Sequence, residues 1–272
     1  MNFEDDIRQF VLTNLPYDPK FNTELAAKSA QDLLIIFGNW KSRIVSAQPR
    51  QVRGSVALLA NPLSKDPQYQ PVLDQIIAKI ETGADLKPHL SRAIRHGYKP
   101  NPPGKKRDRQ DLDLLLNDWN VHHLHLSTTV QSDGFVERTG PLLFAVFTQD
   151  TAYLIDIVDH GGWTREHVIA TIINEWPNKG LVWELNGIQP ARVPQTEDER
   201  KKLRNAHVNS HFYFNNKVYM AAGGLTTAGT SLKNTMSVQD LFRRIKAFEQ
   251  TIKSDPEYLK KNCGAIRLIA AT

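Results

Sequence analysis

The chain has 272 residues, of which 40% are hydrophobic, so it is long enough to form one large domain or two modest ones. Its single cysteine, Cys263, excludes a disulfide framework and a cysteine-based zinc site, and it fits a reducing cytosol. The acidic N-terminus and the short apolar runs predict neither a signal peptide nor a membrane span. We therefore expect a cytoplasmic protein with no membrane partner.

The net charge of +5 is a mild excess that by itself indicates only solubility. The basic residues are concentrated, however, in residues 41–53, 92–109 and 199–204. Clusters of this kind suit a polyanion such as RNA or DNA. The side chains that we expect to bind nucleic acid in the first two stretches are Arg43, Arg50, Arg53, Lys105, Lys106 and Arg107.

The first part of the chain, residues 1–98, predicts a helical N-terminal region. Apolar side chains recur at helical spacing, and Thr23 and Gly83 suit the beginning of one helix and the end of another. The expected helices cover residues 2–15, 23–47, 68–83 and 85–98.

Residues 99–110, with the sequence KPNPPGKKRDRQ, predict an exposed basic linker, because prolines and charged residues do not pack a core. Residues 111–272 then form the expected catalytic domain. It begins with a short helix at 111–119, for which Asp108 or Asp111 is the expected cap.

The periodicity then changes to that of strands. Residues 121–127 alternate, with Leu124 and Leu126 on one face, and 141–162 predict a hairpin. The later elements are a helix at 164–176, a strand at 181–185, a helix at 196–207 and a hairpin at 211–224 whose turn is Asn215–Asn216. A last helix at 237–252 is expected to have Ser237 as its cap and to bury Val238, Leu241, Phe242, Ile245 and Phe248. Strands in hairpins rather than βαβ units favour an α+β fold, in which a small antiparallel sheet packs against helices.

Three histidines in the stretch VHHLHLS raise the question of a functional site. His123 and His125 share a face of the predicted strand, and His160 ends the second strand of the hairpin. One interpretation is an ordinary polar sheet face. A second is a metal site in which Asp159 or His160 joins the two histidines.

The third interpretation is metal-independent cleavage of RNA, which needs no cofactor. This reaction needs a base, an acid and a cation that stabilises the phosphorane. Histidine and arginine suit these roles. His125 and His160 would transfer protons, Arg138 would bind phosphate and His123 would assist, while Trp163 or Tyr153 could stack on a base.

The segment VHHLHLS…ERTGPLLFAVFTQDTAYLIDIVDHGGW resembles the core of RelE/ParE-type bacterial toxins, over about residues 119–163. The resemblance places Arg138 ahead of an apolar strand and His160 at the end of the next, and it puts His125 where that family often has an arginine. It implies an endoribonuclease held in check by an antitoxin protein. The alternatives are a non-enzymatic nucleic-acid-binding or regulatory protein and a histidine-based metalloenzyme.

Overall fold

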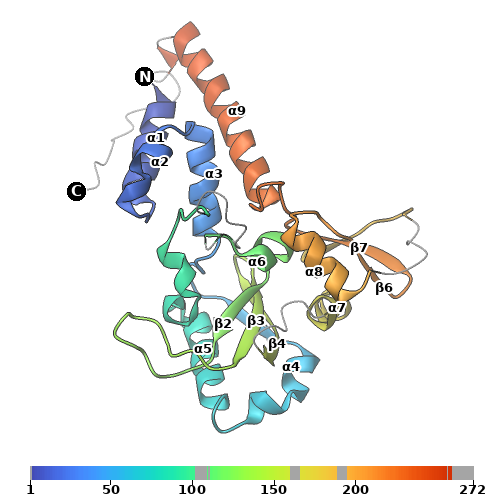
Figure 1. Ribbon diagram of the computed structural model, residues 1–272. Coiled ribbons are helices and arrows are strands. Elements are labelled where there is room, and N and C mark those ends of the chain that lie inside the picture. The colour runs from blue at the N-terminus through green and yellow to red at the C-terminus, as the bar shows by residue number, and fades with distance from the viewer. Residues whose placement is uncertain are drawn as a thin grey trace.

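The computed structural model describes residues 2–101, 109, 111–159, 166–188, 195–255 and 257–258. The strands form two sheets, and most of the helices pack around or above them (Figure 1). The α-helices are α1 (Phe3–Asn14), α2 (Asn22–Ala26), α3 (Ala30–Lys41), α4 (Val56–Ala60), α5 (Gln70–Thr82), α6 (Leu114–Trp119), α7 (Glu166–Glu175), α8 (Glu197–Asn205) and α9 (Leu232–Ser254). The strands are β1 (Gln51–Gly54), β2 (His122–His125), β3 (Pro141–Phe147), β4 (Thr151–Asp159), β5 (Val182–Glu184), β6 (Phe212–Phe214) and β7 (Lys217–Ala221).

The larger sheet has the strand order β1-β4-β3-β2. β3 and β4 pair antiparallel, as the hairpin pattern predicts, and β2 pairs antiparallel with β3, whereas β1 pairs with β4 in parallel. The expected α+β class is confirmed. β1 was not expected, because its four residues include Arg53 and Gly54 and lack an alternating apolar pattern.

Helices cover both faces of this sheet. On one face, α5 contributes Ile76 and Ile80 to a core that also contains Leu124 and Leu154 from the strands. On the other face, α7 packs its apolar side against the sheet together with the second sheet, which has the strand order β5-β7-β6. The first core combines residues 45–94 with residues 124–157, so both expected regions contribute to it.

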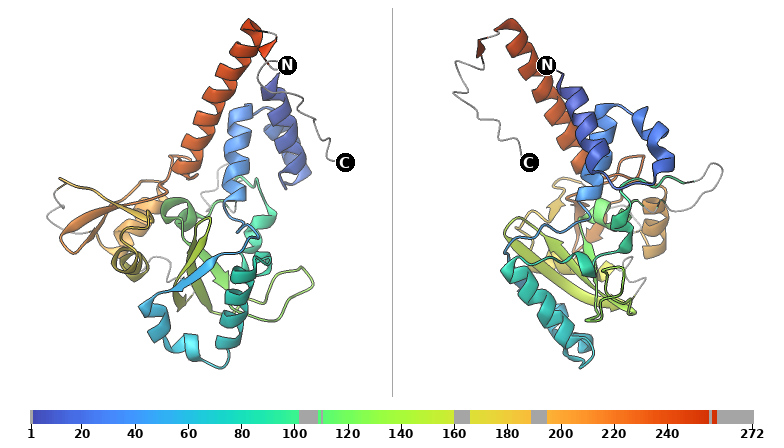
Figure 2. Two further views of the ribbon diagram at one scale, coloured as in Figure 1. Left: turned by 180° about the vertical axis from the view of Figure 1, so that it is seen from behind. Right: turned by 90° about the vertical axis from the view of Figure 1, so that its left-hand side faces the viewer.

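Helices α1, α3 and α9 lie together away from the sheets (Figures 1 and 2). Val238 and Phe242 of α9 are buried against Ala30 at the start of α3. The expectation that Leu241 and Phe248 are also buried is wrong, because both are exposed. None of the helices within the described residues has the length and apolar character that a bilayer crossing requires.

Several expected helix boundaries differ from the structure because local capping groups compete with the helix. The stretch 85–98 contains short 3₁₀ turns, η3 (Lys87–His89) and η4 (Arg92–Arg95), where a helix was expected. Pro88 cannot continue a preceding helix, and the Ser91 side chain accepts from the main-chain N–H of Ala93.

Three more helix starts are corrected. The expected helix at 23–47 is divided into α2 and α3 because the Ser29 hydroxyl accepts from Asp32 N and starts α3. Asp113, and not Asp111, caps α6, while Asp108 lies outside the described residues. α9 begins with Ser231 as its cap instead of Ser237.

Two turn predictions are confirmed. Gly83 ends α5 with a φ of 73°, a left-handed conformation that glycine adopts without steric cost. Asn215 and Asn216 connect β6 to β7 with φ values of 48° and 60°, as a two-residue type I′ turn requires. Further 3₁₀ turns are η1 (Pro19–Phe21) and η2 (Pro62–Lys65).

Candidate functional site

The register of the larger sheet places two of the three clustered histidines on one face. β2 pairs with β3 so that His123 lies opposite Phe144 and His125 lies opposite Leu142. The ring centroids of His123 and His125 are 6.1 Å apart. The expectation that His123 and His125 share one face is confirmed. The pairing of the histidine strand with the hairpin, which the sequence alone did not determine, is a finding of the structure.

The two imidazoles differ in their access to solvent. His125 is only 4% exposed, and its main-chain carbonyl accepts a hydrogen bond from Nδ1 of His89 at 3.0 Å. The side chain of His123 is 23% exposed, and its Nδ1 lies 3.6 Å from Oδ2 of Asp113. His123 is therefore better placed than His125 to exchange a proton with a substrate, which reverses the order of importance that the sequence predicts.

Asp113 is fixed in place by the helix that it caps. Its Oδ1 accepts from the main-chain N–H of Leu116 at 3.0 Å, which leaves Oδ2 directed at His123. A carboxylate beside one ring nitrogen restricts the orientations of an imidazole. The pair thus has the composition of a general base with its orienting group.

His122 projects to the opposite face and is buried. Its ring meets the ring of Phe147 edge-on, with the centroids 5.4 Å apart, and Nε2 donates to the carbonyl of Ser42 at 3.1 Å. Burial lowers the pKa of His122 to about 4, so the imidazole is neutral at physiological pH. Because Nε2 carries the proton, Nδ1 is an acceptor, and it has no hydrogen-bond partner within the described part of the chain.

The ends of three strands meet at the edge where β2 terminates. β3 begins at Pro141, which pairs with Asp159 at the end of β4, and Leu142 pairs with both Val158 and His125. Arg138 is exposed on the loop before β3. The neighbouring Thr139 donates its hydroxyl to the carbonyl of Leu126 at 2.9 Å, which ties this loop to the end of β2.

The remaining residues expected at this edge of the sheet are only partly described. His160 and Trp163 lie outside the described residues, so their proposed roles stay predictions. Tyr153 is not available to stack on a base, since it is buried and packs on Trp176 with the ring centroids 4.9 Å apart.

A pocket of about 640 Å³ lies beside β2, and His123 forms part of its wall. Its apolar lining comes from η4 and the residue Leu90 before it, from α6 and from β3, and includes Ile94, Leu116 and Phe144. The ionisable side chains that line it are Arg43, Arg109, Asp113, His122, His123 and His207.

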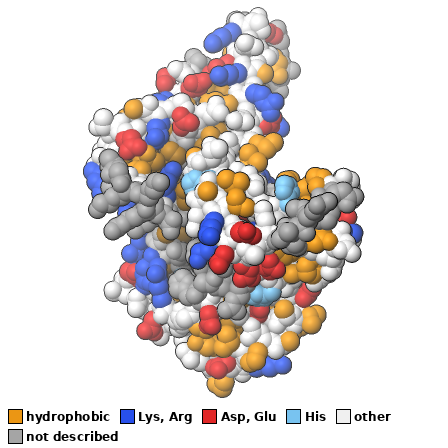
Figure 3. Space-filling model, turned by 45° about the vertical axis from the view of Figure 1, so that its right-hand side comes forward, with side chains coloured by type: hydrophobic (Ala, Val, Ile, Leu, Met, Phe, Trp, Pro, Cys, Tyr) orange, Lys and Arg blue, Asp and Glu red, His pale blue; other side chains and the backbone are white. Residues whose placement is uncertain are grey.

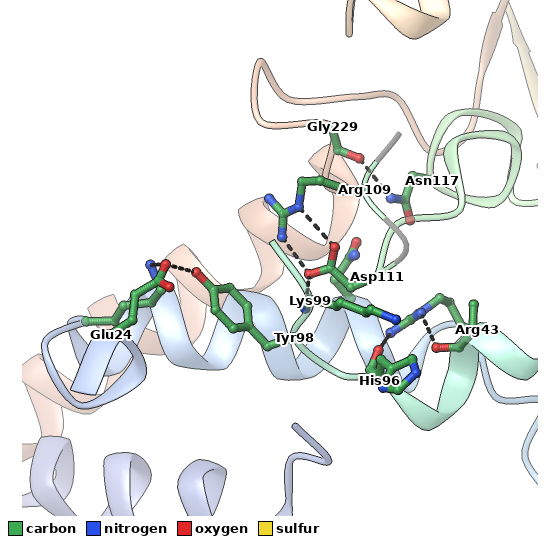
Figure 4. A network of polar contacts seen from close by, with 12 residues as sticks. Glu24, Arg43, His96, Tyr98, Lys99, Arg109, Asp111, Asn117 and Gly229 are labelled. Carbon is green, nitrogen blue, oxygen red and sulfur yellow. Dashed lines mark hydrogen bonds and ion pairs between the residues drawn. The ribbon is translucent and has the colours of Figure 1, made fainter. Parts of the chain in front are cut away.

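Arg109, in the wall of this pocket, belongs to a network of polar contacts (Figure 4). Arg109 donates to both carboxylate oxygens of buried Asp111, at 3.0 and 2.7 Å, and Asp111 also accepts from the main-chain N–H of Lys99 at 3.0 Å. Tyr98 next to it donates its hydroxyl to Glu24, so the network reaches the N-terminal helices. A bidentate pair of an arginine and a carboxylate fixes the positions of both side chains.

The basic stretches do not all lie on the surface. Arg43 is 4% exposed and donates to the carbonyls of Ala93 and His96, at 3.0 and 2.7 Å. Arg50 is 8% exposed and donates to the carbonyls of Thr148 and Ser46, at 2.8 and 2.9 Å.

The expectation that Arg43 and Arg50 present their charge to nucleic acid on the surface is therefore wrong, because main-chain carbonyls occupy their guanidinium groups. Arg53 is exposed on β1, at the edge of the sheet. Lys105, Lys106 and Arg107 lie outside the described residues. On the face drawn in Figure 3, basic and acidic side chains are interspersed.

An ion pair that the sequence analysis did not predict lies on the α7 side of the sheet. Oδ2 of Asp156 lies 3.2 Å from Nε2 of His167, and Oδ1 accepts from Nδ2 of Asn61 at 2.6 Å. Burial tends to raise the pKa of Asp156, but the hydrogen bonds from His167 and Asn61 outweigh it and hold the pKa below its ordinary value.

A β-bulge explains why sequence reasoning did not find this pair. The register with β3 shifts between Phe144 and Ala145, so that Ile155 is an extra residue in β4. Asp156 consequently points to the α7 face. The alternation in the sequence contains no sign of this shift, although an acidic residue within an otherwise apolar strand is a signal in itself.

No known protein family matches the chain, and no significant similarity to a curated protein or to a solved structure was found. The resemblance to RelE/ParE-type toxins therefore remains a prediction from the sequence. Among the described residues, no three His, Cys, Asp or Glu side chains are grouped so that they could hold a metal ion.

Proposed function

We propose that this protein is an endoribonuclease that cleaves RNA without a metal ion, at a site that includes His123, His125 and Arg138. The observation that supports it best is the pair of neighbouring imidazoles, one of which is half-buried beside the carboxylate of Asp113. Strand packing alone does not require this combination of groups. General acid–base catalysis uses a positioned side chain of this kind, most often a histidine.

The reaction divides among these side chains as follows. His123 accepts the proton from a ribose 2′-hydroxyl, whose oxygen attacks the adjacent phosphorus. The bond from phosphorus to the 5′-oxygen breaks, and that oxygen takes a proton from a second acid, leaving a 2′,3′-cyclic phosphate and a 5′-hydroxyl. Asp113 stabilises the imidazolium that forms on His123.

Arg138 supplies the cation for the phosphorane, since it is exposed on the loop that Thr139 ties to the end of β2. His160, which lies outside the described residues, is the second acid, as the sequence predicts. His125 packs beside His123 and limits the orientations of its ring.

The resemblance to RelE/ParE-type toxins extends the proposal to biology. The protein would act in the cytoplasm, in a toxin–antitoxin or phage-defence system, and an antitoxin protein would neutralise it. The alternative of a non-enzymatic nucleic-acid-binding protein is weaker, because two of the arginines on which it depended are buried.

The test is RNA cleavage in excess EDTA, combined with growth of cells that express the protein. The variants are His123→Ala, His125→Ala, His160→Ala and Arg138→Ala, and the matched control is His211→Ala, which removes an exposed imidazole. We expect wild type and the control to cleave, and loss of His123 to slow cleavage about 100-fold or more.

Two results would contradict the proposal. If wild type neither cleaves RNA in EDTA nor slows growth, the function is wrong. If it cleaves but His123→Ala, His125→Ala and Arg138→Ala all match it, the site is wrong. Cleavage that EDTA abolishes and added metal restores would instead identify a metalloenzyme.

A further inference from the structure

The pocket beside β2 joins segments that are distant in the sequence. Arg43 follows α3, Ala93 belongs to η4, Leu112 precedes α6 and His207 follows α8, yet all of them line the same space. Its volume of about 640 Å³ falls within the range of small-molecule sites, which are mostly apolar with a few placed polar groups.

Arg43 and His122, which line the pocket, each carry a buried polar atom without a hydrogen-bond partner among the described residues. Nε of Arg43 is a donor and Nδ1 of neutral His122 is an acceptor, and neither has a hydrogen-bond partner among the residues described. Buried polar groups are nearly always satisfied, and each exception requires an explanation. A bound molecule that offers both an acceptor and a donor would satisfy the two atoms together.

The charges around the pocket are close to balanced. Arg109 is paired with Asp111, and the carboxylate of Asp113 lies near enough to Arg43 to interact with it electrostatically, as does Asp111. A highly charged anion therefore finds little uncompensated positive charge here. A neutral ligand with an apolar body and a polar edge suits the lining better.

We propose that this pocket binds a single base of the RNA substrate, through an edge that carries an acceptor next to a donor. Each nucleobase is a flat heteroaromatic ring with such groups on its edge, and single-stranded RNA can turn a base out of its stack. This inference rests on the proposed function, because it takes the bound base to be part of the RNA that the protein cleaves. His123, in the same wall, would then lie near the sugar of the bound nucleotide.

Binding requires some rearrangement of the wall, because Nε of Arg43 and Nδ1 of His122 are covered by neighbouring groups. Changes of side-chain rotamer at a binding site are common. Leu112 and Leu114, which also line the pocket, are only partly buried.

The experiment measures binding of adenosine, guanosine, cytidine and uridine to the full chain by calorimetry and by ligand-observed NMR. Ala93→Trp and, separately, Leu112→Trp fill the pocket with an indole, and Leu59→Trp adds the same group on the exposed side of α4 as the control. Circular dichroism checks that each variant is folded, and decanoate serves as a competing apolar probe.

We expect at least one nucleoside to bind to wild type and to Leu59→Trp, and a folded pocket-filling variant to weaken that binding about tenfold or more. The inference is overturned if no nucleoside binds at 10-millimolar concentrations (about 3 kcal/mol of binding free energy), if filling the pocket leaves binding unchanged, or if decanoate binds more tightly than every nucleoside. RNA cleavage is measured on the same samples. Cleavage without nucleoside binding would overturn the base pocket alone, whereas nucleoside binding without cleavage would overturn the ribonuclease.

Discussion

The clearest perturbation of the proposed site is Asp113→Asn, which removes one charge and keeps the helix cap. Asparagine caps a helix as well as aspartate does, so α6 should retain its start. With Nδ1 of His123 3.6 Å from Oδ2, two full charges would interact by about 5 kcal/mol at an effective dielectric constant of about 20. Both side chains are 23% exposed, so solvent reduces this to about 1 kcal/mol.

A loss of about 1 kcal/mol from a transition state that carries an imidazolium slows the reaction about five-fold. We expect Asp113→Asn to lower the single-turnover rate of RNA cleavage by that factor, with thermal unfolding unchanged. Asp113→Ala should lose the same factor in rate and also about 1 kcal/mol of stability, because the cap is lost. Asp18→Asn, a change at the cap of η1, is the control.

A contrary result would be that Asp113→Asn cleaves at the wild-type rate while Asp113→Ala loses activity only in proportion to its loss of folded protein. That result would make Asp113 a helix cap with no part in positioning His123.

Three further predictions concern stability. Gly223→Ala should lower the free energy of unfolding in urea by about 1–3 kcal/mol, because a Cβ there would lie 2.6 Å from the carbonyl oxygen of Asn117. In the control, Gly140→Ala, the Cβ meets no described atom within 4 Å, so the free energy of unfolding should change little. Equal losses in the two variants would contradict this. Arg204→Met should lower the free energy of unfolding by about 3–5 kcal/mol, because it leaves buried Asp118 unpaired. Adding Asp118→Leu should restore most of that stability. The control, Lys217→Met, breaks an exposed pair with Glu184 and should change the stability little. Because the pKa of His122 is about 4 in the folded chain and about 6.5 when unfolded, the unfolded chain binds more protons between these values, so stability should fall by about 3 kcal/mol as pH drops from 6.5 to 4. His122→Asn should flatten that dependence, and an unchanged pH profile would show that His122 does not control it.

Regular patterns in the sequence predicted the sheet well. The alternation of His123, Leu124 and His125 determined which side chains share a face, and the Asn215–Asn216 pair determined the turn between β6 and β7. These features depend on neighbours in the chain. They could therefore be predicted without knowledge of the rest of the fold.

Features that depend on distant parts of the chain could not be predicted. The burial of Arg43 depends on carbonyls of Ala93 and His96, some fifty residues away. The ion pair of Asp156 with His167 depends on a bulge that the alternation does not reveal. The pocket beside β2 is likewise assembled from several segments, so its polar groups could not be grouped in advance.

The most direct test of the central claim is an analysis of the ends formed when a defined single-stranded RNA is incubated with the protein in EDTA. We expect 2′,3′-cyclic phosphate and 5′-hydroxyl ends with wild type, and none at a position where the ribose is replaced by deoxyribose. We also expect His123→Ala to form these ends about 100-fold more slowly or not at all. Intact RNA with wild type, cleavage at the deoxyribose position, or equal cleavage by His123→Ala would contradict the claim.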